Sequence, residues 1–320
     1  MSLAVQFHDL HPTPASTSLR DEILTGFRAV QKFASPKFFY DQRGSELFDR
    51  ICKQPEYYPT RTEETILAEA ADEIATIAGH EATLIELGSG ASRKVRLLLE
   101  AMRPTSYLGI DISRDFLLDS TRRLAADYPW LEVHAACADF SCNMELPDGL
   151  CCERPVGFFP GSSIGNFDPQ AAEDFLRGLH SLLPTGSGLL VGIDLVKDKA
   201  TLEAAYNDAA GVTAAFNLNL LERVRHELHA KIDPANFAHQ AFFNEEHSRI
   251  EMHLVSQLPQ VVTIEGERFS FLEGETIHTE NSYKYTVEGF QALAGRAGFE
   301  ALSSWTDANS LFSVHYLTRA

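Results

Sequence analysis

The 320-residue sequence is short of basic residues, of cysteine and of long apolar runs, and each shortage excludes a class of protein. Lys and Arg number 27 against 45 Asp and Glu, and the net charge of −18 disfavours binding to nucleic acid or to anionic lipid. No apolar run reaches the length of a membrane span, and the first residues do not join a basic segment to an apolar one, as a secretory signal would. We therefore expect a soluble, cytoplasmic monomer whose partner is a small molecule, with neither nucleic acid nor membrane bound.

The cysteines and histidines also lack the spacings of common metal sites. The five cysteines are Cys52, Cys137, Cys142, Cys151 and Cys152. None has the paired spacing of a zinc site, and the adjacent Cys151 and Cys152 would close a strained ring as a disulfide, so we expect reduced thiols. His226 and His229 are three residues apart, whereas the metalloprotease pattern places its histidines four apart. The sequence thus predicts no metal site.

From about residue 60 onward, apolar runs of strand length alternate with segments of helical spacing. Strands are expected within 82–90, 106–113, 131–140, 155–167 and 188–196, with helices within 91–102, 114–128 and 169–183. Five strands joined by helical crossovers predict an α/β fold with a doubly wound, mostly parallel sheet of the Rossmann type. Sheets of this kind bind ligands at the carboxyl ends of their strands, where the strand order reverses.

The alternation stops after Lys197, which predicts a second part of the chain. A helical stretch at 201–230 is followed by strand-like segments, and a helix with two closing strands then returns to the first sheet. We assign 61–199 and 286–320 to the first domain. Residues 1–60 and 200–285 are assigned to a second, smaller α+β lobe.

The stretch "ELGSG", Glu86 to Gly90, lies where the first strand of that sheet meets its first helix, the usual place for a nucleotide-type cofactor. Glycines there let the backbone approach a ligand closely. The dinucleotide pattern is incomplete, because Arg93 stands where its third glycine would be, and no phosphate-binding P-loop is present. An acid two residues before G-x-G is typical instead of S-adenosylmethionine (SAM)-dependent methyltransferases.

Two further acids follow the next strands. Asp111, 21 residues after Gly90, can accept both hydrogen bonds of a ribose diol, and Asp139 can receive an adenine amino group with Phe140 packed beside the ring. The alternative is that both are ordinary strand-terminal aspartates.

The segment "HTENSYKY" places Glu280 and Ser282 two positions apart. In a strand they would share a face, roughly 7 Å apart, and form a short polar pair. A solvated strand face is the alternative.

With these residues in view, the chain resembles the histidine Nα-methyltransferase family of ergothioneine biosynthesis, which trimethylates free histidine to hercynine. The resemblance rests on "FFYDQRGSELFDRICKQPEYYPTRTE" (38–63), "ELGSGASRK", "PGSSIGNF" and "TENSYKY". It implies a class I methyltransferase fold, SAM as the methyl donor, and a second lobe that binds the substrate.

The resemblance also implies roles for individual residues. The SAM contacts fall on Gly88, Lys94, Asp111, Asp139 and Phe140. The histidine contacts fall on Tyr57, Asn166, Tyr206, Glu280 and Ser282, and Gly161 matches a position that lines the substrate amine. Tyr57, Asn166 and Gly161 would thus lie nearest to the chemistry, and Tyr58 is the neighbouring alternative to Tyr57.

The predicted pair also explains the choice of substrate. A neutral imidazole has one N–H donor and one bare nitrogen, and the Glu280 carboxylate with the Ser282 hydroxyl supplies the complement of both. Indole has a donor only, so tryptophan would leave the hydroxyl of Ser282 unpaired, at a cost of about 1–3 kcal/mol. The alternatives are a methyltransferase for tryptophan or a thiol-bearing histidine derivative, and a non-catalytic cofactor-binding protein of the same fold.

Overall fold

The computed structural model describes residues 5–10, 19–79, 81–141, 145–147, 150 and 155–319. Their chain forms two compact units. The first contains the described residues of Met1–His11, Pro59–Val196 and Tyr283–Ala320, and the second those of Pro12–Tyr58 and Lys197–Ser282.

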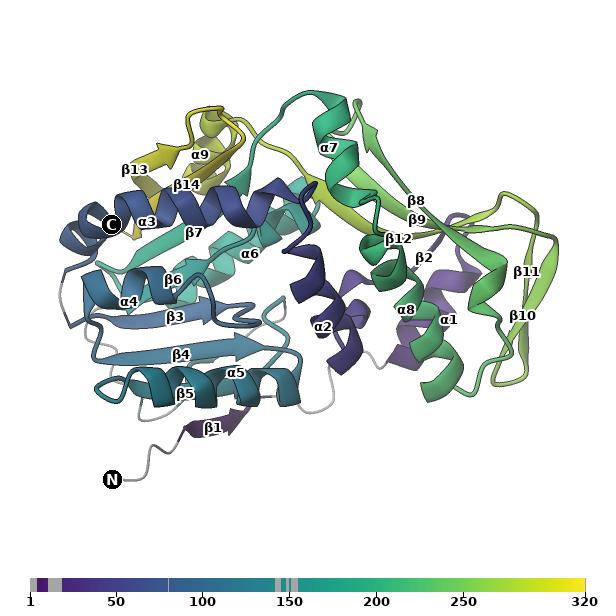
Figure 1. Ribbon diagram of the computed structural model, residues 1–320, viewed down its shortest axis with the longest axis horizontal. Helices are drawn as coiled ribbons and strands as arrows, with labels where there is room; N and C mark the ends of the chain where they lie inside the picture. The colour runs from purple at the N-terminus through teal and green to yellow at the C-terminus, as the bar shows by residue number, and fades with distance from the viewer. Residues whose placement is uncertain are drawn as a thin grey trace. The chain divides into compact units, whose positions relative to one another are not determined.

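The first unit is built on an eight-stranded sheet (Figure 1). In spatial order its strands are β1 (Gln6–Asp9), β5 (Glu132–Cys137), β4 (Ser106–Asp111), β3 (Thr83–Leu87), β6 (Pro155–Phe159), β7 (Gly188–Asp194), β14 (Phe312–Arg319) and β13 (Phe299–Thr306). The first six are parallel, and β14 runs antiparallel to both of its neighbours. The chain winds outward from β3 to β5 and then in the other direction from β6 to β7, which confirms the predicted doubly wound sheet.

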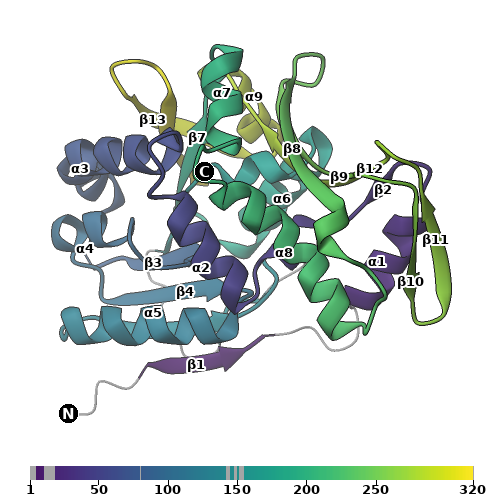
Figure 2. The same cartoon turned by 45° about the vertical axis from the view of Figure 1, so that its right-hand side comes forward.

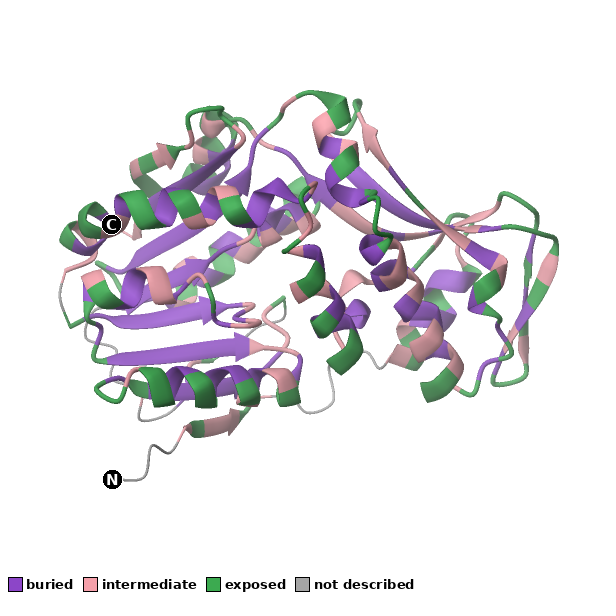
Figure 3. Ribbon diagram, in the orientation of Figure 1, coloured by how far each residue is buried: buried purple, intermediate pink, exposed green. Residues whose placement is uncertain are grey.

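Helices cover both faces of this sheet, in agreement with the continuous apolar runs of its strands. The helices α3 (Tyr58–Ala78), α4 (Arg96–Met102) and α5 (Arg114–Asp127) pack on one face, and α6 (Pro169–Leu182) and α9 (Val287–Arg296) on the other (Figures 1 and 2). Every residue of β3 and of β7 is buried, as Figure 3 shows along the central strands. Because these strands are buried on both faces, the positions of their carboxyl ends, which carry the candidate site, are held by packing.

The strand β1 is a correction to the predicted division of the chain. Residues 1–60 are expected in the second lobe, yet Gln6–Asp9 pair in parallel with β5 at the edge of the first sheet. Its four residues, QFHD, include no run of apolar side chains. An edge strand has only one neighbour to match, so its sequence carries little periodic signal.

The second unit contains a four-stranded sheet and a hairpin. The sheet order is β2 (Lys32–Phe33), β12 (Thr276–Tyr283), β9 (Arg249–Ser256) and β8 (Phe237–Asn244), and β10 (Gln260–Ile264) pairs with β11 (Glu267–Phe271). The α-helices are α1 (Leu19–Arg28), α2 (Gln42–Ile51), α7 (Lys199–Tyr206) and α8 (Val212–Glu227). Short 3-10 turns are η1 (Pro36–Phe39) and η3 (Pro234–Asn236), and η2 (Ser163–Asn166) belongs to the first unit.

The predicted helical stretch at 201–230 is two helices, because a capping residue starts the second one. The Asp208 carboxylate accepts hydrogen bonds from the backbone N–H groups of Val212 and Thr213, at 2.8 and 2.7 Å. Gly211 before them has a φ of +69°, which a helix interior does not allow. The helix α8 then packs on the sheet through Asn217, whose amide donates to the carbonyl of His253 and accepts from the hydroxyl of Thr279.

Within the described part of the chain, no helix combines the length and the apolar character needed to cross a membrane. The expected cytoplasmic location and monomeric state stay predictions.

Candidate active site

The turn after β3 has the backbone that its glycines predict. Gly88 and Gly90 have φ of +69° and +49°, in the left-handed region that favours glycine. The N–H of Gly88 donates to the carbonyl of Ile110 at 2.8 Å, which ties the turn to β4. A Cβ on Gly88 would lie 3.4 Å from the ring of Phe140. The turn therefore packs against the ring of Phe140, and the cofactor roles of Gly88 and Phe140 stay predictions.

The two predicted strand-end aspartates, Asp111 and Asp139, accept hydrogen bonds from backbone N–H groups of nearby turns. The Asp111 carboxylate accepts hydrogen bonds from the N–H of Gly90 and of Ser113, both at 2.9 Å. The Asp139 carboxylate accepts from the N–H of Ser141 at 3.0 Å. The Ser141 hydroxyl also donates to Asp139, so these bonds orient each carboxylate within the turn that follows its strand. The cofactor roles of Asp111 and Asp139 stay predictions.

The acid of the "ELGSG" motif is buried and protonated at neutral pH. Glu86 is only 2% exposed, and the hydroxyl of Tyr107 donates to it at 2.6 Å. Burial raises the pKa of Glu86 to about 8, although the hydrogen bond from Tyr107 and the charge of Lys94 oppose the rise. Glu86 therefore supports the cofactor turn as a neutral acid.

A buried carboxylate that the sequence analysis did not single out holds the predicted cofactor residue Lys94. Glu63, on α3, accepts from the ammonium of Lys94 at 2.5 Å and from the N–H of Gly161 at 2.9 and 3.1 Å. A Cβ on Gly192 would lie 2.0 Å from a Glu63 oxygen, so the missing side chain on β7 makes room for the carboxylate. Burial raises the pKa of Glu63, and Lys94 and Gly161 oppose the rise. Glu63 thus joins the cofactor loop to the segment that begins the predicted amine site.

The segment from Gly161 to Asn166 has a strained backbone that tertiary contacts hold. Gly161 and Ser162 have φ of +81° and +58°, and Ser162 is a non-glycine residue in the left-handed region. The Ser162 hydroxyl accepts from the N–H of Asp194 at 2.9 Å. A Cβ on Gly165 would lie 2.7 Å from the carbonyl oxygen of Tyr283. These contacts set the position of η2, whose last residue is the predicted Asn166.

In the second unit, four of the predicted histidine contacts lie together. The hydroxyl of Tyr206 donates to the hydroxyl of Ser282 at 2.8 Å. The rings of Tyr57 and Tyr206 meet nearly edge to face, with centroids 6.2 Å apart. Burial, with smaller contributions from Tyr206 and Glu280, raises the pKa of Tyr57. The two tyrosines, Glu280 and Ser282 therefore form one cluster, although they come from three distant segments.

The structure also distinguishes Tyr57 from its neighbour. The Tyr58 hydroxyl accepts from the ammonium of Lys197 at 2.7 Å, and this cation lies 4.5 Å from the centre of the Tyr58 ring. Tyr58 is therefore committed to Lys197, whereas Tyr57 faces Tyr206. This arrangement favours Tyr57 as the member of the cluster.

One group of side chains in the described residues has the chemistry of a metal site. The candidate ligand atoms of Glu251, His253 and His278 lie within 4.8 Å of one another. The two imidazole rings stack at 4.5 Å with an angle of 12°, so their in-plane lone pairs run side by side rather than converge on one ion. The guanidinium of Arg249, 2.6 Å from Glu251, already neutralises the carboxylate. The arrangement favours hydrogen bonding over metal coordination.

The thiols can be followed only in part, because Cys142, Cys151 and Cys152 lie outside the described residues. Cys137 donates its S–H to the carbonyl of Ile112 at 3.7 Å, and burial raises its pKa to about 11. The thiol of Cys137 is thus protonated at neutral pH.

We predict that Glu63→Gln destabilises the protein far more than the matched change Glu64→Gln. The first variant leaves the ammonium of Lys94 without its buried partner, and the expected loss is about 3 kcal/mol of the free energy of unfolding. Glu64 instead pairs with Arg93 near the surface, at 3.1 Å, and its loss is expected to cost about 0.5 kcal/mol. Denaturant unfolding of the three proteins measures both values, and equal losses would contradict the structural role of Glu63.

The buried carboxyl of Glu86 predicts that the free energy of unfolding depends on pH. The variant Glu86→Gln should lack this dependence. The folded carboxyl stays protonated up to about pH 8, whereas the unfolded one ionises near the ordinary value of 4.5. The wild type should therefore lose stability relative to the variant as the pH rises from about 5 to 8, by on the order of 4 kcal/mol. Urea unfolding of both proteins across that pH range measures the difference between their free energies of unfolding. A difference that stays constant with pH would contradict a protonated Glu86 in the folded protein.

The whole chain is similar to known methyltransferases. Residues 19–319 match the profile of a family described as histidine-specific methyltransferase, SAM-dependent. A histidine N-alpha-methyltransferase of Mycolicibacterium smegmatis is 40% identical over 312 residues, which cover 95% of this chain and 96% of that protein.

More distant relatives carry other names. Ergothioneine biosynthesis protein 1 of Neurospora crassa is 29% identical over 98% of this chain, which spans only 36% of that longer protein. A 4-dimethylallyltryptophan N-methyltransferase of Aspergillus fumigatus is 26% identical, with 93% of each chain covered. The first unit has the doubly wound sheet and the glycine turn that such a methyltransferase requires. On these grounds the chain belongs to the family of histidine-specific, SAM-dependent methyltransferases.

Proposed function

We propose that the protein transfers three methyl groups from SAM to the α-amino group of free L-histidine and so forms hercynine, a step of ergothioneine biosynthesis. The observation that carries this proposal is the cluster of Tyr57, Tyr206, Glu280 and Ser282, which offers both a hydrogen-bond donor and an acceptor. Membership of the histidine-specific family supports the same substrate.

The ring of histidine is assigned to Glu280 and Ser282. The oxygen of Ser282 accepts from Tyr206, and the hydroxyl of Ser282 is assigned as the donor to the bare imidazole nitrogen. The Glu280 carboxylate accepts from the imidazole N–H. An amino acid whose ring lacks either group would leave a buried polar atom without a partner, which costs about 1–3 kcal/mol.

The other end of histidine is assigned to Tyr57, Asn166 and Gly161. A tyrosine hydroxyl has one hydrogen, and that of Tyr206 is donated to Ser282, so Tyr57 is the better donor to the substrate carboxylate, with Tyr206 beside it. Burial keeps Tyr57 protonated, as this role requires. Asn166 orients the α-amino group, and Gly161 leaves space next to it.

The cofactor is assigned to the first unit, whose residues fit it. Phe140, whose ring lies against Gly88, is assigned to the adenine of SAM, and Lys94, whose ammonium also binds Glu63, is assigned to its carboxylate. Asp111 is assigned to the ribose and Asp139 to the adenine amino group. When bound, SAM supplies an electrophilic methyl group, so the protein needs no nucleophile of its own. Its residues place the amine lone pair in line with the S–CH3 bond and exclude water.

The direct test is to incubate the purified protein with SAM and an equimolar mixture of histidine, tryptophan and a thiol-bearing histidine derivative. Mass spectrometry should find the mass gain of three methylations on histidine first, with the other amino acids methylated at least about tenfold more slowly. The proposal is wrong if tryptophan or the thiol derivative is preferred, or if none of the three gains mass.

A further inference from the structure

Within the described residues, the strand that carries Glu280 pairs with its outer neighbour β2 only as far as His278. β2 pairs with β12 at Ile277 and His278, and the N–H of Ala34 donates to the carbonyl of His278 at 2.9 Å. Carbonyls of alternate residues in a strand point to the same edge, so that of Glu280 points to the side of β2, beyond the last β2 pairing. A carbonyl on such an open edge needs another donor.

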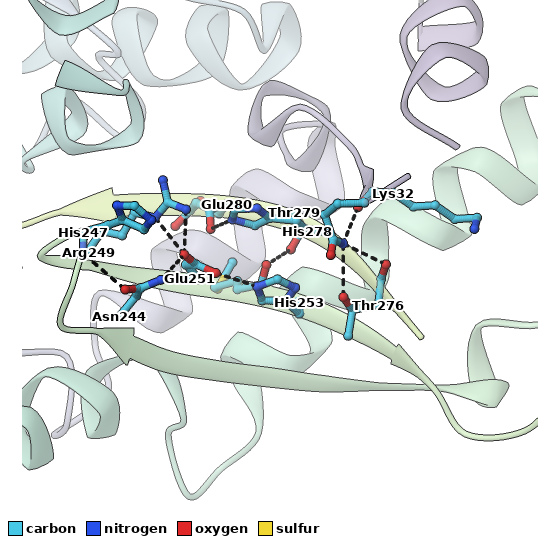
Figure 4. A network of polar contacts seen from close by, with 12 residues as sticks. Lys32, Asn244, His247, Arg249, Glu251, His253, Thr276, His278, Thr279 and Glu280 are labelled. Atoms are coloured by element: carbon cyan, nitrogen blue, oxygen red, sulfur yellow. Dashed lines mark hydrogen bonds and ion pairs between the residues drawn. The ribbon is translucent and has the colours of Figure 1, made fainter. Parts of the chain in front are cut away.

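The side chain of His278 supplies this donor. Its Nε2 lies 3.1 Å from the carbonyl oxygen of Glu280 (Figure 4). A carbonyl can only accept, so the hydrogen is on Nε2. Burial, together with the nearby ring of His253, lowers the pKa of His278 and keeps its ring neutral. The imidazole thus replaces the missing strand at the residue that is to bind the substrate ring.

The ring of His278 is itself held in place. It stacks on the ring of His253, whose other face packs on Phe242 at 5.3 Å. The Nε2 of His253 donates to Glu251 at 3.0 Å, which fixes the rotation of that ring. The second oxygen of Glu251 accepts from Arg249 at 2.6 Å, so the carboxylate is anchored in turn.

The anchor at Glu251 remains charged over the whole physiological range. Asn244 donates to it at 2.9 Å, beside Arg249 (Figure 4). Burial opposes ionisation, but the hydrogen bonds from His253, Arg249 and Asn244 lower the pKa of Glu251 to about 2. The ionised carboxylate of Glu251 therefore accepts from all three donors, and one of these bonds holds the ring of His253 that stacks on His278.

We propose that His278 is a positioning residue for histidine recognition: it holds the main chain of Glu280 through the carbonyl, while the stacked and anchored ring of His253 holds His278. This rests on the proposed role of Glu280. Fixing the carbonyl restrains the backbone from which the Glu280 side chain extends, so less ordering is needed when the substrate ring binds. The restraint acts on substrate binding and leaves the cofactor site of the first unit untouched.

Two substitutions separate the hydrogen bond from the stacking. His278→Phe keeps an aromatic ring on His253 but has no donor, whereas His278→Gln loses the ring and keeps an N–H near the position of Nε2. We expect His278→Phe to raise KM for histidine about tenfold, which corresponds to about 1.4 kcal/mol, and to lower the preference for histidine over tryptophan. His278→Gln should stay within about threefold of the wild type. Both should bind S-adenosylhomocysteine as the wild type does in titration calorimetry.

The matched control is Glu275→Gln, at the residue just before β12. Glu275 forms an ion pair with Lys32, and its loss should leave KM for histidine within about twofold. The inference is overturned if folded His278→Phe keeps the KM of the wild type, if His278→Gln is impaired as strongly, or if Glu275→Gln raises KM to the same extent.

A further variant separates this inference from the proposed function. If Glu280→Ala relaxes the preference for histidine while His278→Phe does not, only the role of His278 is refuted. If Glu280→Ala leaves the preference intact, the assignment of Glu280 to the substrate ring fails, and the role of His278 fails with it.

Discussion

The hydrogen bond from Tyr206 to Ser282 orients one of the two groups on which the proposed recognition of histidine depends. The hydroxyl of Ser282 can donate as well as accept, whereas the carboxylate of Glu280 can only accept. A donor beside an acceptor matches neutral imidazole, which has one group of each kind. In the second unit, the ring of Tyr57 packs against that of Tyr206, and the imidazole of His278 donates to the main-chain carbonyl of Glu280.

In the first unit, buried polar groups near the predicted cofactor turn are also paired with one another. Glu86, at the end of β3, remains protonated beside Tyr107, while Glu63 accepts from the ammonium of Lys94 and from the N–H of Gly161, which follows β6. A buried ion pair such as Glu63–Lys94 adds little net stability, but removing one partner is costly, which favours the arrangement that keeps both.

Features encoded by local sequence could be predicted, and features that depend on distant segments could not. The apolar run of β3 followed by Gly88 predicted the cofactor turn, and the family resemblance placed Tyr57. Nothing local distinguishes Glu63 from Glu64, because the burial of Glu63 depends on how α3 packs and on the absence of a side chain at Gly192. The contact of His278 with the carbonyl of Glu280 was missed for a similar reason, since it depends on where the two-residue strand β2 ends.

The most direct test of histidine recognition compares L-histidine with thiazolylalanine, whose ring keeps a nitrogen acceptor but has no N–H. The ratio of their kcat/KM values reports the energy of the bond to Glu280, since the two substrates share the amine, the carboxylate and a ring of similar size. We predict a kcat/KM for thiazolylalanine at least about tenfold lower, because the carboxylate of Glu280 loses its donor, and a smaller ratio in Glu280→Ala. Equal kcat/KM values in the wild-type protein would contradict the proposed pairing of a donor and an acceptor with the imidazole ring.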